Sequence, residues 1–125
     1  MAAGSDVGRR NAELGRYGEE VASQYLTERG FVVLSRNWRC RDGELDIVAT
    51  DRTRLVICEV KTRTGLGFGS PAEAVTPVKA ARIRRLAAAW LTEHRTGWCE
   101  VRFDVLSVLS PPGGTTTVTH LPGAF

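Results

Sequence analysis

The sequence predicts a single α/β domain in which a mixed central sheet is flanked by helices. Helix-like and strand-like segments follow one another in the order α-β-β-β-α-β-β. The chain has 125 residues, which is enough for one compact core and too short for two ordinary domains. We expect residues 1–9 to be a disordered start, residues 10–120 to form the domain and residues 121–125 to be a tail.

The first helix is predicted from apolar residues that recur at helical spacing over 14–26, with Asn11 as its N-cap and Gly30 at its end. At about 100° per residue, Glu20 projects to the solvent side and Glu19 to the margin of the apolar stripe. Glu19 is therefore either a group that leans toward the packing surface or an ordinary boundary carboxylate.

A strand and a hairpin come next. Residues 31–38 are rich in apolar and β-branched side chains, and 39–42 form a connection. In the segment 43–61, two short apolar runs flank the polar centre 50–54, which predicts a hairpin. The second run is apolar on both faces, so we expect it to lie inside a sheet that is covered on both sides.

This second run carries Glu59 and Lys61 on one face, because alternate residues of a strand point the same way. A two-residue turn at 52–53 places Asp46 directly opposite Glu59. The same register places Glu44 opposite Lys61.

Two carboxylates that face each other across a strand pair repel, and the surrounding aliphatic residues would keep water from screening them. A divalent cation between Asp46 and Glu59 removes the repulsion, and Mg²⁺ prefers such oxygen ligands. Lys61 would then hold a phosphate or orient the attacking water. The alternative is that Glu59 and Lys61 are an exposed ion pair on an edge strand.

The rest of the chain adds a helix and two strands. Residues 62–70 are a glycine-rich loop that either closes on a ligand or merely connects, and 98–109 and 115–120 are predicted strands. Thr76, followed by a proline, starts a helix that runs to about residue 94. Lys79 projects onto the apolar side of its first turn, where it reaches toward a phosphate or snorkels to water.

Composition narrows the class of protein. Charged residues make up 25% and hydrophobic residues 42% of the chain, as in soluble globular proteins, and the net charge is +3. No apolar run approaches membrane-spanning length and no secretion signal is visible at the start, so we expect a cytoplasmic protein. The three cysteines and two histidines lack the spacing of a disulfide framework or a zinc site.

Four motifs together resemble the YraN-like family of small bacterial proteins. They are Gly15-Arg16-Tyr17-Gly18-Glu19, the segment 43–49, Glu59-Val60-Lys61-Thr62-Arg63 and Ala74-Val75-Thr76-Pro77-Val78-Lys79. That family is similar to archaeal Holliday junction resolvases and to the restriction-endonuclease-like, or PD-(D/E)xK, nucleases, whose pattern is Asp, a spacer and Glu-x-Lys. The proline that often begins the pattern is missing before Asp46.

The resemblance implies a restriction-endonuclease-like fold and Mg²⁺-dependent hydrolysis of phosphodiester bonds, with Mn²⁺ as a substitute, in branched or structured DNA. It makes Asp46 and Glu59 metal ligands, together with the Val60 carbonyl. Lys61 would be the catalytic lysine, and Glu19 would complete the acidic cluster directly or through water. Resolvases of this type are symmetric dimers, so a homodimer is expected by analogy.

Four basic residues are candidates for contacts with the nucleic-acid backbone, namely Arg63, Lys79, Arg82 and Arg85. Such contacts give salt-sensitive affinity without sequence choice. A competing interpretation is a non-catalytic nucleic-acid-binding module that keeps the fold and recruits a partner. A third, a protein-interaction scaffold, would leave the basic residues unexplained.

Overall fold

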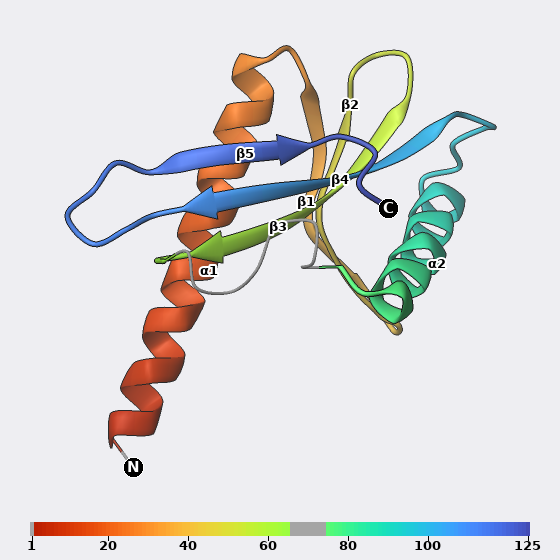
Figure 1. Cartoon of the computed structure of the whole chain (residues 1–125). Helices are drawn as coiled ribbons and strands as arrows, with labels where there is room; N and C mark the ends of the chain where they lie inside the picture. Colours follow the sequence, from red (N-terminus) through yellow and green to blue (C-terminus); the bar gives the residue numbers. More distant parts are fainter. Residues whose placement is uncertain (1, 66–74) are drawn as a thin grey trace.

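The computed structural model describes residues 2–65 and 75–125, with side chains from residue 8 onward. In these ranges one five-stranded sheet lies between two helices (Figure 1). Helix α1 (Ala2–Glu28) packs on one face and helix α2 (Pro77–Glu93) on the other. The element order is α-β-β-β-α-β-β, which confirms the predicted fold class.

The strands are β1 (Val32–Cys40), β2 (Gly43–Thr50), β3 (Leu55–Arg63), β4 (Val101–Leu109) and β5 (Thr117–Leu121). They lie in the order β1-β2-β3-β4-β5. Neighbours are antiparallel except for β3 and β4, which are parallel because the chain crosses over through α2. Strand β3 is therefore central, as its two apolar faces predicted, and β5 is an edge.

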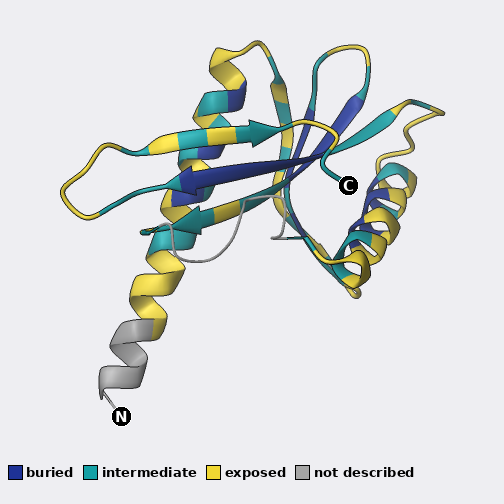
Figure 2. Cartoon of the chain, in the orientation of Figure 1, coloured by how far each residue is buried: buried dark blue, intermediate teal, exposed yellow. Residues whose placement is uncertain are grey.

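Two apolar cores hold the helices to the sheet. Ala22 and Leu26 of α1 pack with Val56 of β3 on one face. Leu86 of α2 packs with Ile57, the next residue of β3, on the other face. Burial is concentrated in β2, β3 and β4 (Figure 2). The middle of the sheet is therefore closely packed and provides rigid support for a site at the ends of these strands.

Two helix boundaries follow from local chemistry and were predicted. Gly30 has a φ of 89°, a left-handed conformation that suits glycine, and it ends α1. The Thr76 side chain accepts a hydrogen bond from the backbone N–H of Lys79 at 3.2 Å, and Pro77 follows at the first helical position.

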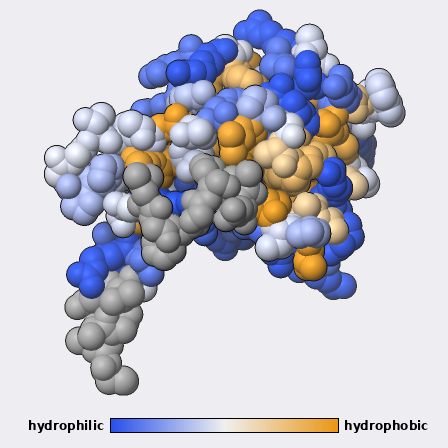
Figure 3. Space-filling view, in the orientation of Figure 1, coloured by the Kyte–Doolittle hydropathy of each residue, from blue (hydrophilic) through white to orange (hydrophobic). Residues whose placement is uncertain are grey.

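The start of α1 differs from the prediction. The helix begins at Ala2, so Asn11 is not its N-cap, and residues 2–9, which we expected to be disordered, are helical. This end of α1 projects beyond the sheet (Figure 1), and Arg9 and Arg10 on it are exposed. The coloured surface next to this end is hydrophilic (Figure 3). The sequence of residues 2–9 carries no apolar stripe at helical spacing, so it does not predict a helix.

Within the described ranges, neither helix is long and apolar enough to cross a bilayer.

Candidate metal site at a fork in the sheet

Strands β2 and β3 form a ladder that ends early. Its pairs run from Thr50–Leu55 to Ile47–Cys58, which confirms the predicted register. Beyond Ile47, β2 remains paired with β1 and β3 with β4, so the sheet forks at this point. The two ladder pairs predicted further along, Asp46 with Glu59 and Glu44 with Lys61, do not form, because each strand follows its outer neighbour.

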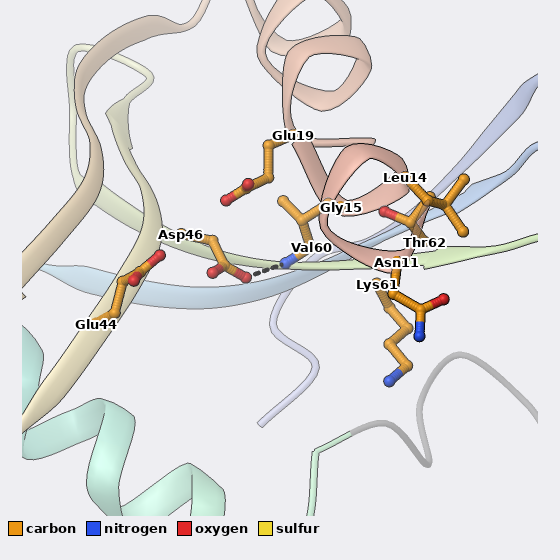
Figure 4. Close-up of a pocket in the computed structure, with 9 residues that line it drawn as sticks. All are labelled: Asn11, Leu14, Gly15, Glu19, Glu44, Asp46, Val60, Lys61 and Thr62. Atoms are coloured by element: carbon orange, nitrogen blue, oxygen red, sulfur yellow. Dashed lines mark hydrogen bonds between the residues drawn. The ribbon is translucent and has the colours of Figure 1, made fainter. Parts of the chain in front are cut away.

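Asp46 occupies the opening of the fork. Its Oδ2 accepts a hydrogen bond from the backbone N–H of Val60 at 2.8 Å (Figure 4). The carboxylate thus takes the place of the carbonyl that a continued ladder would offer to this N–H. Because a backbone donor away from bulk water needs a partner, this bond holds the Asp46 side chain between the strands.

Three carboxylates meet in front of the fork. Glu19 of α1 and Glu44 and Asp46 of β2 each place one oxygen within 4.8 Å of the others. They line a hollow of about 380 Å³, whose wall also includes Val60 and Lys61. Figure 4 shows the three carboxylates pointing toward one another from the helix and the strand. We call these three residues the acidic cluster.

Glu44 is the member of the cluster that the sequence analysis missed. The predicted register assigned it to a pair with Lys61, and it received no role. A signal was present, because Glu44 and Asp46 are two positions apart on one strand and such residues point to the same side. The prediction joined Asp46 to Glu19 and Glu59; the structure adds Glu44 to Asp46 and Glu19 in the hollow, and the charge of Glu59 and a side-chain hydrogen bond with it still act on Asp46.

Glu19 reaches the cluster because α1 lies very close to β3. A Cβ atom built at Gly18 would overlap Oγ1 of Thr62 and would lie 2.8 Å from Thr62 Cβ. Only a residue without a side chain permits this approach. The carboxylate that follows Gly18 in the helix is thereby brought to the fork.

The cluster carries more negative charge than its surroundings balance. Burial, followed by the negative charge of Glu59, raises the pKa of Asp46 to about 8, although the hydrogen bond from Val60 opposes the shift. Burial also raises the pKa of Glu19, and the nearby charge of Glu44 adds to this rise, whereas Arg36 lowers it. A positive charge inside the hollow would relieve both groups.

Glu59 is not among the described residues that line the hollow. It stays close to Asp46, whose pKa its charge raises, and it also has an ion-pair partner on α2. Its Oε1 is 2.6 Å from Nζ of Lys79 on α2, and its side chain is 13% exposed. Lys79 therefore does not merely snorkel to water, because it neutralises a half-buried carboxylate next to Asp46. The predicted site residues Glu19, Asp46 and Lys61 line the hollow, whereas Glu59 does not.

We expect Lys79→Met to lower the free energy of unfolding by about 1–3 kcal/mol, because the Glu59 carboxylate would lose its partner. Arg85→Met, at an exposed position of the same helix, is the control and should change stability by less than about 0.5 kcal/mol. Urea unfolding measures both. Repeating Lys79→Met in a Glu59→Gln background should cost little; an equal loss in both backgrounds would contradict the role of this ion pair.

The remaining predicted site residues are basic. Lys61 is exposed and, within the described ranges, forms no ion pair; in Figure 4 its side chain extends away from the three carboxylates along the same hollow. Arg82 and Arg85 are exposed on α2, and Arg63 is half-buried at the end of β3. Most of the predicted glycine-rich loop 62–70 lies outside the described residues.

Fold and site together define a small α/β domain with an acidic hollow where two strands of its sheet separate. Comparison with known proteins shows that the chain belongs to the family described as uncharacterised protein family UPF0102, whose match covers residues 18–108. This match includes the whole acidic cluster and confirms the predicted YraN-like family.

Relatives cover nearly the whole chain. The UPF0102 protein of Frankia alni is 62% identical over 112 residues, which are 90% of this chain and 93% of that protein. The one from Acidothermus cellulolyticus is 54% identical over 122 residues, with 90% and 92% covered. The one from Nocardia farcinica is 52% identical over 119 residues, with 95% and 93% covered.

Proposed function

We propose that this protein is a metal-dependent endonuclease that hydrolyses phosphodiester bonds in branched or structured DNA. The observation that carries the proposal is the acidic cluster: three carboxylate oxygens from two elements lie within 4.8 Å of one another beside an exposed lysine. Carboxylates at such distances repel unless a proton or a cation lies between them. In the described ranges Glu44 is the one member of the cluster with a salt bridge, to the largely exposed Arg39 at 2.8 Å.

The donor set fits Mg²⁺ or Mn²⁺. All three groups are hard oxygen ligands, and their partial exposure leaves room for the water molecules that Mg²⁺ retains. Because the N–H and C=O of one strand residue point to the same side, the Val60 carbonyl is directed at the fork as well and offers a further oxygen. When bound, such an ion supplies polarisation of the scissile phosphate and acidification of a water molecule.

The residues of the chain would divide the remaining work. Glu19, Glu44 and Asp46 would hold the ion, and Lys61, which lines the same hollow, would hydrogen-bond a phosphate oxygen on which charge develops. Glu59, held by Lys79, adds negative potential behind Asp46 and limits how far that side chain can turn. Glu44 is thus a proposed ligand in addition to those expected from the sequence, and the expected ligand Glu59 would have to leave Lys79 to reach the ion.

The flanking backbone of the substrate would contact basic side chains around the fork. Arg82 and Arg85 are exposed on α2 and suit this role, with Arg63 at the end of β3. Lys79 is engaged with Glu59, so we expect it to contribute less to phosphate binding than Arg82 and Arg85. The affinity for DNA should fall steeply with salt and depend little on sequence.

Cleavage assays test the proposal on a four-way junction, a flap and a linear duplex, each with Mg²⁺, Mn²⁺ or a chelator. We expect metal-dependent products from the branched substrates, and Lys61→Ala should lower the rate about 10²–10³-fold, as loss of a group that stabilises developing charge does elsewhere. Arg41→Ala, at an exposed residue of the β1–β2 turn, is the control and should cleave normally. Metal-independent DNA binding without products under any condition would favour the non-catalytic module.

A further inference from the structure

The edge strand β1 carries an asparagine in an unusual backbone conformation next to the acidic cluster. Asn37 lies between the ladder pairs Arg36–Ile47 and Trp38–Leu45 and thus opposite Asp46, with which it forms no ladder pair. Its φ is 53°, in the left-handed region that non-glycine residues rarely occupy and that asparagine tolerates better than most. A local distortion of this kind persists only where the surrounding contacts maintain it.

The Asn37 side chain bridges two members of the acidic cluster. In the amide orientation that satisfies both partners, Nδ2 donates to Oε1 of Glu44 at 3.1 Å and to Oε2 of Glu19 at 2.5 Å. An amide nitrogen has two N–H groups and therefore serves one carboxylate with each. The amide is the contact through which β1 links α1 to β2 at the fork.

The cationic side chains described near the cluster do not perform this bridging. Arg39 binds the second oxygen of Glu44 at 2.8 Å from a largely exposed position, and Arg36 pairs with Glu20 rather than with Glu19. Such exposed pairs contribute little to the position of a side chain. Asn37 alone, among the side chains described, donates to Glu19 and Glu44 together.

We propose that Asn37 is a positioning residue of the cation site: its amide holds Glu19 and Glu44 side by side in the cation-free protein, so that both ligands are in place when the ion arrives. The inference rests on the proposed function, because it takes these two residues as ligands. Groups that orient metal ligands typically contribute a factor of 10–100 to metal affinity. The left-handed backbone at Asn37 is the conformation that directs its short side chain between the two glutamates.

Calorimetric titration with Mn²⁺ tests this role without any nucleic-acid substrate. Asn37→Gly removes the amide but accommodates the positive φ without strain, and we expect Mn²⁺ affinity to fall about 10–100-fold. Arg52→Gly is the matched control: Arg52 also has a positive φ, of 81°, in the β2–β3 turn, and it lies away from the cluster. The Arg52→Gly protein should bind Mn²⁺ with the same affinity as the unmodified protein.

Asn37→Asp provides a second readout that needs no metal. The substitution preserves shape but replaces the two donors with a fourth carboxylate, so in a chelating buffer the melting temperature should fall by several degrees. Added Mn²⁺ should raise the melting temperature more than in the unmodified protein. Because Asn37 is exposed, no loss of core packing contributes to this difference.

The outcomes separate the two proposals. If the unmodified protein binds Mn²⁺ and Asn37→Gly binds it equally well, the role of Asn37 is wrong and the proposed function stands. If Asn37→Asp melts like the unmodified protein in chelator, the bridge itself is refuted. If the unmodified protein binds no Mn²⁺, the cation site and the role of Asn37 within it both fail.

Discussion

Asp46→Asn is expected to abolish Mn²⁺ binding at the fork and, at the same time, to make the cation-free protein more stable. The substitution removes the carboxylate at the centre of the acidic cluster, and an amide is a much weaker ligand than a carboxylate. It also removes the charge that Glu19 and Glu59 repel, while the Asn oxygen can still accept the hydrogen bond from Val60. Loss of function with a gain of stability is typical of a site whose charges are arranged for a ligand.

The stability gain should depend on pH in a defined direction. Because the pKa of Asp46 is raised to about 8 in the folded chain, the folded state holds this proton more tightly than the unfolded state does. The stability that it contributes is complete below the unfolded pKa of about 4 and is lost as the pH rises toward 8. The difference in melting temperature between Asp46→Asn and the unmodified protein should therefore grow from pH 5 to about pH 8.

Differential scanning calorimetry in chelator, together with Mn²⁺ titration, measures both effects. Asp42→Asn is the matched control, because Asp42 is an exposed carboxylate in the turn that leads into β2, and it should alter neither quantity. Saturating Mn²⁺ should reverse the order of stability, since only the unmodified protein gains from the ion. An Asp46→Asn protein that binds Mn²⁺ normally would remove the basis of the proposed site.

Gly18→Ala is expected to destabilise the protein by about 1–3 kcal/mol or more, because the new methyl group would overlap the side chain of Thr62. Helix α1 would have to move away from β3 to accommodate it. Since Glu19 follows directly in the helix, this movement would also weaken Mn²⁺ binding. Chemical unfolding and the Mn²⁺ titration report the two effects separately.

The same helix supplies the control. A Cβ at Gly15 meets no atom within 4 Å, so Gly15→Ala should stabilise the protein by about 0.5–1 kcal/mol through helix propensity alone. Combining Gly18→Ala with Thr62→Ala removes Oγ1 and Cγ2, two of the three overlapping atoms, and should recover part of the loss. If both glycine variants behave alike, close contact between α1 and β3 is not what Gly18 provides.

Local features of the sequence were sufficient for most of the architecture. The helix start at Thr76 and the helix end at Gly30 follow from capping chemistry. The central place of β3 follows from its two apolar faces, and the β2–β3 register follows from the turn at 52–53. Each of these depends on residues that are close in the chain, which is why spacing alone reveals them.

The sequence by itself therefore determined the family, the order of elements and the presence of Glu19 and Asp46 near one another. Only the tertiary structure decided that the β2–β3 ladder stops at Ile47, which makes Glu44 a member of the acidic cluster and gives Glu59 to Lys79. The physical reason is that a strand has two neighbours. Where β1 and β4 draw β2 and β3 apart, pairing rules for the hairpin no longer apply, and the contacts come from residues distant in the chain.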